Sequence, residues 1–176
     1  MNWYKIAKKD SCKGWMAVRL DTTNSSKIKK WGKKYISDDI IYTKKGHGRE
    51  GGTHITLVHG LCLDDPAVIR KLVEKEKPIK DKLKRIGFFR KDPDFDVVII
   101  KIESKDLEKL NNKISKFLNV ESIYDEYQPH CTIAYVKKGE AAKYAGDTTF
   151  NDTNLIFDKI VFINNKNEES NINLGK

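Results

Sequence analysis

Short runs of the chain alternate apolar and polar residues, or are almost entirely apolar, and each such run predicts a β-strand. Residues 14–20 alternate between two faces, with Trp15 on one face and Met16 on the other. Residues 95–103 are nearly continuous Val and Ile, the pattern of a buried strand. In chain order, the expected strands cover residues 14–20, 53–60, 77–91, 95–103, 130–136 and 154–163, followed by a short edge strand in the polar C-terminal stretch.

Three other segments repeat apolar residues every three or four positions, which places these residues on one face of a helix. The expected helices cover residues 25–35, 63–77 and 105–118. Polar residues before each stripe are candidate N-caps, namely Thr22 to Ser25, Asp64 or Asp65, and Ser104. The apolar stripes are Ile28, Trp31 and Tyr35; Val68, Leu72 and Val73; and Leu107, Leu110, Ile114 and Leu118.

The order of these elements is similar in the two halves of the chain. The first half contains a strand, a helix, a strand and a helix, and the second contains two strands, a helix, a strand and the closing strands. No long low-complexity linker divides them. We therefore expect one α+β domain over residues 1–176, with two pseudo-symmetric antiparallel-sheet lobes, helices outside and a central cleft.

Composition narrows the class of protein. The chain has 176 residues and a formal net charge of +9 at pH 7. Its lysines are spread along the sequence, so the charge favours anionic ligands bound at a surface rather than a disordered basic tail. No apolar run has the length of a membrane span, and residues 1–15 lack the apolar core of a secretory signal. We expect a cytoplasmic monomer with no membrane partner.

The three cysteines, Cys12, Cys62 and Cys131, have no CxxC spacing. This pattern favours reduced thiols over a disulfide framework or a zinc site. Cys131 follows a histidine, but adjacent strand residues point to opposite faces. We expect Cys131 to be a small buried residue rather than a nucleophile.

Two of the four histidines stand in the same local pattern. HITL begins at His54 and HCTI begins at His130, so each histidine is followed by an apolar residue, a threonine and another apolar residue. Because strand side chains alternate, His54 and Thr56 share one face, about 7 Å apart along the strand. His130 and Thr132 do the same. Each motif thus presents an imidazole and a hydroxyl together.

Two such motifs side by side suit the cleavage of a phosphodiester. The reaction needs a base for the attacking oxygen, an acid for the leaving oxygen and donors for the charge on the phosphoryl oxygens. Histidine titrates near neutrality, so one copy can act as base while the other is charged. No HxH, HExxH or carboxylate spacing completes a metal site, and we expect no cofactor.

HITL and HCTI resemble the paired motifs of the 2H phosphoesterase superfamily, each of the form H-apolar-[S/T]-apolar. The resemblance is closest to small bacterial and phage LigT-like (2′-5′ RNA ligase-like) members, and it covers the chain from about residue 14 onward. It implies that His54 and His130 form the acid–base pair, with Thr56 and Thr132 on the phosphate. Their order of action is left open, because the arrangement is symmetric.

Several other residues are candidates for substrate contact. Trp15, Tyr124 and Tyr127 are candidates for base stacking, and Arg49 and Lys137 for a second phosphate. Packing and solvated surface are the competing interpretations.

Two further features flank the first motif. Residues 43–52 are glycine-rich and basic and predict a mobile loop, which either is plainly solvated or folds over a phosphate. His59 lies five residues after His54, so simple alternation turns it away from the catalytic face. We expect His59 to be structural.

The sequence predicts a metal-independent phosphodiesterase that acts on a nucleotide, a cyclic oligonucleotide or a short RNA. The preferred substrate is a cyclic oligonucleotide signal, which would fit phage counter-defence in a host cytoplasm. Cleavage of an RNA 2′,3′-cyclic phosphate or of a 2′-5′ oligonucleotide is the alternative within this class. A non-catalytic RNA- or nucleotide-binding protein is the alternative from another class.

Overall fold

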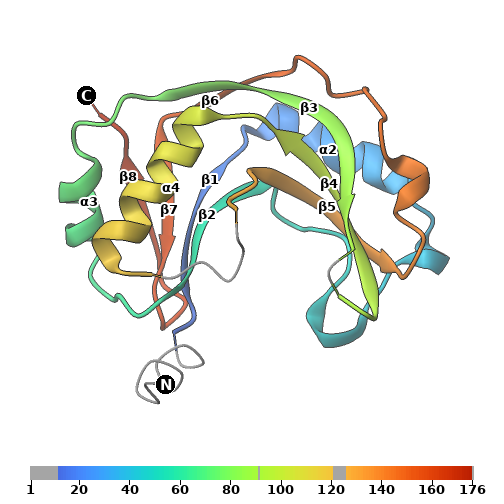
Figure 1. Cartoon of the computed structure of the whole chain (residues 1–176), viewed down its shortest axis with the longest axis horizontal. Coiled ribbons are helices and arrows are strands. Elements are labelled where there is room, and N and C mark those ends of the chain that lie inside the picture. Colours follow the sequence, from blue (N-terminus) through green and yellow to red (C-terminus); the bar gives the residue numbers. More distant parts are fainter. Residues whose placement is uncertain (1–11, 91, 121–125, 176) are drawn as a thin grey trace.

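Each histidine motif lies on the edge strand of its own antiparallel sheet in the computed structural model, which describes residues 12–90, 92–120 and 126–175. In those residues two four-stranded sheets form, and Figure 1 shows them as the two legs of an arch. One sheet has the order β2 (His54–Leu61), β1 (Gly14–Arg19), β7 (Lys159–Ile163) and β8 (Glu169–Asn173). The other has the order β5 (His130–Lys137), β4 (Phe95–Ile102), β3 (Ile79–Phe89) and β6 (Asn154–Phe157). The expected α+β fold with two antiparallel-sheet lobes is confirmed.

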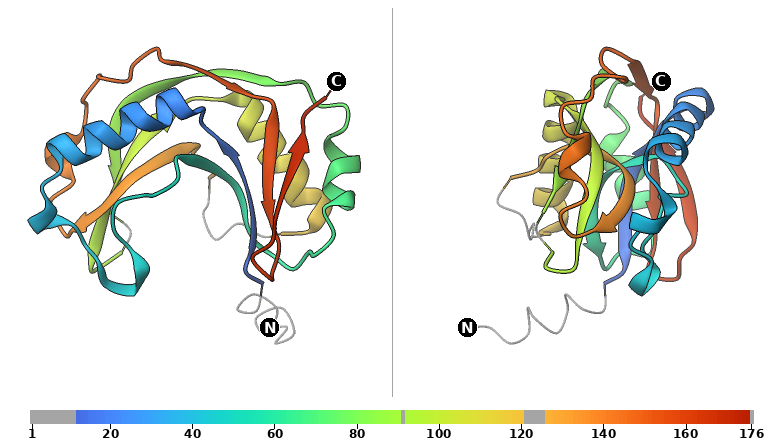
Figure 2. Two further views of the ribbon diagram at one scale, coloured as in Figure 1. Left: turned by 180° about the vertical axis from the view of Figure 1, so that it is seen from behind. Right: turned by 90° about the vertical axis from the view of Figure 1, so that its right-hand side faces the viewer.

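The helices reinforce the twofold arrangement by crossing between lobes. Helix α2 (Thr22–Tyr35) follows β1 but contacts β5, whereas α4 (Lys105–Leu118) follows β4 but contacts β2. The short helix α3 (Ala67–Val73) contacts β8. In the two views of Figure 2, α2 (blue) lies against one lobe, and α3 (green) and α4 (yellow) lie against the other. We call the face of each sheet opposite these helices the open face.

Capping confirms one predicted helix start and corrects another. The Ser104 hydroxyl accepts a hydrogen bond of 3.1 Å from the Leu107 N–H, as expected for the cap of α4. Helix α2 is capped instead by Asp21, whose carboxylate accepts a hydrogen bond of 2.8 Å from the Asn24 N–H. In α3, the predicted stripe is confirmed at Val73, which is buried, but it is wrong at Val68, which is exposed while Ile69 is buried. That helix also ends at Val73, earlier than the sequence pattern suggests.

Residues 154–163 form two strands, not the one that the sequence predicts. The chain leaves one lobe after β6, which pairs with β3, and enters the other as β7, which pairs with β1 and β8. Asp158 is the single residue between them, and its carbonyl accepts a hydrogen bond of 2.8 Å from the Leu174 N–H. A continuous apolar run therefore serves two sheets, which local pattern alone cannot show.

The expectation of reduced thiols is wrong for Cys12 and Cys62, which form a disulfide. Strand pairing explains the link, because Gly14 of β1 lies opposite Leu61 of β2 and brings the flanking cysteines together. In the described part of the chain, no helix is long and apolar enough to cross a membrane.

The glycine-rich segment before the first motif is fastened to the second motif strand. The N–H groups of Tyr42 and Glu50 donate to the carbonyls of Tyr135 and Ile133, and the Tyr135 N–H donates to the carbonyl of Gly48. Two isolated bridges, Ile41 with Val136 and Arg49 with Ala134, extend the contact. The segment thus covers the outer edge of β5, and both of its ends are held by the sheet.

Candidate active site

The two motif histidines lie on neighbouring strands and are held in the same way. Strands β2 and β5 contact each other where the two sheets meet. His54 Nδ1 lies 3.0 Å from the Gly52 carbonyl, and His130 Nδ1 lies 2.7 Å from the Gln128 carbonyl. Because a carbonyl oxygen only accepts, each Nδ1 carries a proton. Nε2 is then the nitrogen of each ring that can exchange a proton with a substrate.

The two imidazoles also share one electrostatic environment. Burial lowers the pKa of His130, the hydrogen bond to Gln128 opposes this shift, and the charge of His54 lowers the pKa further. A proton on one ring therefore disfavours a proton on the other. The lowered pKa keeps His130 neutral at pH 7, the state required of a general base.

Cys131 is buried, as expected. Burial raises the pKa of its thiol to about 12, so the thiol is protonated at neutral pH. A protonated thiol is a poor nucleophile. The side chain therefore contributes to the packing of the core rather than to chemistry.

Thr56 and Thr132 occupy the open face, while the residues beside them are buried. Ile55 and Leu57 are 0% and 2% exposed and flank the partly exposed Thr56. Cys131 and Ile133 flank Thr132 in the same way. Each threonine therefore lies on the same face as its motif histidine, as the alternation predicted.

A β-bulge in each motif strand returns the residue five positions after the histidine to the open face. The partners of His54, Thr56 and His59 are Arg19, Ala17 and Trp15. Those of His130, Thr132 and Tyr135 are Lys101, Ile99 and Val97. These partners are every second residue of β1 and of β4, so each set lies on one face of its sheet. Because residues directly opposite each other share a face, His59 and Tyr135 lie on the same face as the motif histidines. The expectation that His59 faces away is therefore wrong, because simple alternation leaves out the bulge.

The strand register also reveals residues near the histidines that the sequence pattern does not indicate. Arg19 lies opposite His54 and forms a two-point ion pair with Glu169, at 2.7 and 2.8 Å. Lys101 lies opposite His130, and Phe89 meets the His130 ring edge-on at 4.8 Å. A hollow of about 290 Å³ beside His130 is lined by Phe89, Lys101, Tyr127 and Gln128, among others. These neighbours become apparent only when the pairing register of the strands is known.

The remaining candidate residues have different surroundings. The Trp15 ring lies 5.1 Å from the His54 ring, on the open face. The Tyr127 hydroxyl donates to the Thr56 carbonyl at 2.9 Å, and burial raises its pKa. Lys137 is exposed at the last position of β5. Tyr124 lies outside the described residues.

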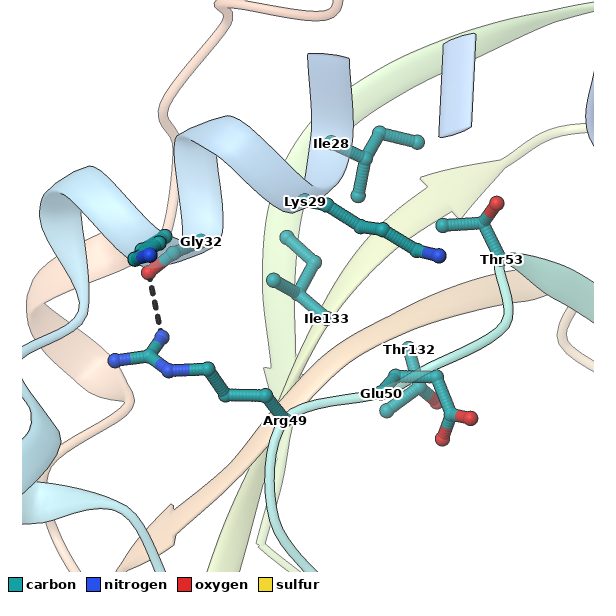
Figure 3. Close-up of a pocket in the computed structure, with 9 residues that line it drawn as sticks. Ile28, Lys29, Gly32, Arg49, Glu50, Thr53, Thr132 and Ile133 are labelled. Atoms are coloured by element: carbon teal, nitrogen blue, oxygen red, sulfur yellow. Dashed lines mark hydrogen bonds between the residues drawn. The ribbon is translucent and has the colours of Figure 1, made fainter. Parts of the chain in front are cut away.

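Arg49 is held by the protein itself. Its guanidinium donates to the carbonyls of Gly32 and Ile36, at 2.7 and 2.5 Å, and to the Asp38 carboxylate at 2.7 Å. These carbonyls are at the C-terminal end of α2, where a cation is favoured. Figure 3 shows Arg49 turned towards Gly32 at one end of a hollow of about 220 Å³ between α2 and β5. The structure gives Arg49 a capping role.

We expect Arg49→Met to lower the free energy of unfolding by about 2 kcal/mol, because hydrogen bonds to a charged group are lost at carbonyls of α2. Urea denaturation measures the change, and Lys30→Met, which removes an exposed cation from α2, is the matched control. Arg49→Met should leave substrate KM within about threefold of the parent value. A raised KM with unchanged stability would assign Arg49 to the substrate instead.

The geometry defines what chemistry this site can perform. Two imidazoles in one environment can take up and release protons, and two hydroxyls on the same face can donate to phosphoryl oxygens. Among the residues that the structure describes, no three His, Cys, Asp or Glu side chains are grouped to hold a metal ion. The donor set thus suits acid–base transfer at a phosphorus centre.

A family model matches most of the chain. It is described as the 2′-5′ RNA ligase superfamily and matches residues 40–168, which include both histidine motifs. No curated protein matches the chain in sequence.

Solved structures show the same fold at low sequence identity. TT0787 of Thermus thermophilus has a TM-score of 0.65 and 15% identity, over 92% of this chain and 97% of that one. E. coli LigT complexed with 3′-AMP has a TM-score of 0.62 and 13% identity, over 92% and 94%. Kluyveromyces marxianus Usb1 has a TM-score of 0.60 and 9% identity, over 93% and 99%. Likeness at this level of identity is a likeness of fold.

Proposed function

The chain belongs to the 2′-5′ RNA ligase superfamily and is a 2H phosphoesterase, and we propose that it cleaves a nucleotide phosphodiester with His54 and His130 as its acid–base pair. The supporting observation is that the same type of hydrogen bond orients both imidazoles. Each Nδ1 is bonded to the carbonyl two residues earlier, on adjacent edge strands, and each Nε2 is left for proton transfer. A purely structural histidine pair would not need two identical tautomers.

The lowered pKa of His130 assigns the two roles within this proposal. His130 takes the proton from the attacking oxygen of a water or a ribose hydroxyl as that oxygen bonds to phosphorus. The bond from phosphorus to the leaving oxygen breaks, and His54 gives that oxygen its proton. After the step His130 is protonated and His54 is neutral, and exchange with solvent restores both.

Thr56 and Thr132 supply the donors for the phosphoryl oxygens in this account. Each lies two residues after its histidine on the open face. Lys101 adds positive charge on the same face beside His130. The protein thereby offers neutral donors and a cation to an anionic centre whose charge grows in the transition state.

The nucleotide part of the proposal is supported by charge and by the fold relatives. The chain carries a formal net charge of +9, and E. coli LigT, which has this fold, is crystallised with 3′-AMP. We propose a cyclic oligonucleotide signal as the substrate, and a 2′,3′-cyclic phosphate end and a 2′-5′ linkage are the alternatives with the same chemistry. We also propose that cleavage of this signal serves phage counter-defence.

A panel of substrates tests the reaction. The protein is incubated in EDTA with 3′,3′-cyclic di- and trinucleotides, 2′,3′-cyclic AMP and 2′-5′-linked diadenylate, and products are identified by mass. We expect cleavage of at least one class, with the cyclic oligonucleotides first, and far slower cleavage by His54→Ala. Cleavage of 2′,3′-cyclic AMP alone would overturn the substrate proposal, and activity that requires an added metal would overturn the mechanism. Binding of nucleotide without any cleavage would make the chain a binding protein.

A further inference from the structure

Aromatic residues lie on the open face of both sheets, at matching register positions relative to the motif threonines. On the first sheet Trp15 lies directly opposite His59, two residues from Ala17, the partner of Thr56. On the second sheet Tyr135 lies opposite Val97, two residues from Ile99, the partner of Thr132. Two strand steps correspond to about 7 Å. The backbone of each aromatic residue is thus about 7 Å along its sheet from that of a threonine proposed to hold the phosphate.

The two aromatic groups differ in composition. Trp15 is partly exposed, lies 5.1 Å from the His54 ring and has the exposed His59 opposite it. We call Trp15 the first platform. Tyr135 has its ring 4.4 Å from His47 and 5.4 Å from Phe95, and His47 lies 4.7 Å from Phe95. We call these three partly exposed rings the second platform.

The bulges are what place both platforms on the reacting face. Without the bulge in β2, His59 and Trp15 would not be in register, and without that in β5, Tyr135 would turn into the helix-covered core. The bulges in β2 and β5 therefore have the same effect, because each places an aromatic ring on the open face of its sheet. Burial of a large ring in the core would have been the more stabilising placement for Trp15 or Tyr135.

We infer that the two platforms bind two nucleobases, one on each side of the scissile phosphate. The substrate is then a phosphodiester that joins two nucleosides, in a linear or a cyclic oligonucleotide, rather than a 2′,3′-cyclic phosphate within one nucleoside. Bases stack on aromatic rings with little dependence on sequence, and a single nucleoside can occupy only one platform. This inference rests on the proposed function, because it takes the phosphate to lie between the two motifs.

Binding tests this inference without turnover. The affinities of the dinucleoside monophosphate ApA and of AMP are measured by calorimetry on His130→Ala, in which the expected loss of kcat keeps cleavage slow during the measurement. We expect ApA to bind about tenfold more tightly than AMP, and either Trp15→Ala or Tyr135→Ala to remove that advantage. Because AMP can occupy only one platform, its affinity should fall in no more than one of the two variants. Trp15→Phe and Tyr135→Phe keep a stacking surface and should retain most of the advantage.

Phe117→Ala is the matched control, because it removes an exposed aromatic ring from α4, on the helix side of the sheet. Equal affinities of ApA and AMP in the parent, or ring variants that leave ApA affinity unchanged, would overturn the two-base site. If Trp15→Ala weakened ApA and AMP equally, and Tyr135→Ala did the same, the rings would be positioning residues instead. An intact binding pattern in a protein that cleaves nothing in the substrate panel would reject the proposed function and keep the two-base site.

Discussion

Alanine in place of either His54 or His130 lowers kcat by a factor of about 10²–10⁴, the usual contribution of one positioned proton-transfer group. Each imidazole is proposed to move one proton in the rate-determining step, and no other titratable group is bonded in the same arrangement on β2 or β5 in the described residues. KM should change much less, because the phosphate donors remain. Initial rates on the substrate identified by mass give both constants.

The histidine variants must be shown to be folded. Each substitution removes one hydrogen bond to a carbonyl at a partly exposed position, so we expect a loss of only about 1 kcal/mol in the free energy of unfolding. Added imidazole should restore part of the rate in both alanine variants, since it supplies the missing proton carrier. A variant that is folded and retains more than about a tenth of the parent kcat would remove that histidine from the mechanism.

Valine in place of Thr56 or Thr132 lowers kcat by about a hundredfold, the second largest effect that we expect. Valine keeps the shape of threonine but cannot donate to a phosphoryl oxygen, and donors directed at developing charge contribute about 10²-fold or more. The loss should appear mainly in kcat, because the donated bond strengthens as charge builds on the phosphoryl group. Steady-state kinetics of the two single variants measures it.

Serine is the matched control at both positions, because it keeps the hydroxyl and loses only a methyl group. Thr56→Ser and Thr132→Ser should stay within about fivefold of the parent kcat, since the donor to the phosphoryl oxygen is retained. If valine and serine variants lost activity equally, packing on the open face would explain the effect and the threonines would not be phosphate donors.

The sequence was sufficient for features that depend on local periodicity. The apolar stripe and Ser104 cap of α4 were predictable because both arise within one or two helical turns. The shared face of each motif histidine and threonine was predictable because it needs only two residues of regular strand. The symmetric order of elements was enough to expect two related lobes.

Features that depend on strand register were not predictable. The bulges that turn His59 to the open face, and the pairing that brings Cys12 to Cys62, are set by the partner strand. Arg49 stands in a glycine-rich basic run, yet its partners are carbonyls of a helix 13 and 17 residues earlier. The division of residues 154–163 between two sheets is likewise decided by packing, since apolar residues occur on both sides of the division.

The proposed reaction requires two symmetric motifs to perform an asymmetric step. Both imidazoles have the same tautomer and the same type of carbonyl partner, so the motifs alone do not distinguish acid from base. Burial lowers the pKa of His130, and the charge of His54 adds to that shift, which favours His130 as the base in the proposed reaction. As a coupled pair, the rings favour one proton between them over two.

The pH dependence of kcat/KM in EDTA, for the parent and the two alanine variants, tests the central claim most directly. We predict a bell, with a rate that rises as His130 loses its proton and an alkaline limb that requires the proposed His54 acid. Because the pKa of His130 is lowered, the acidic limb should lie below the usual range for histidine. His130→Ala should abolish the acidic limb and His54→Ala the alkaline limb. A bell that survives in both variants would contradict acid–base catalysis by these two histidines.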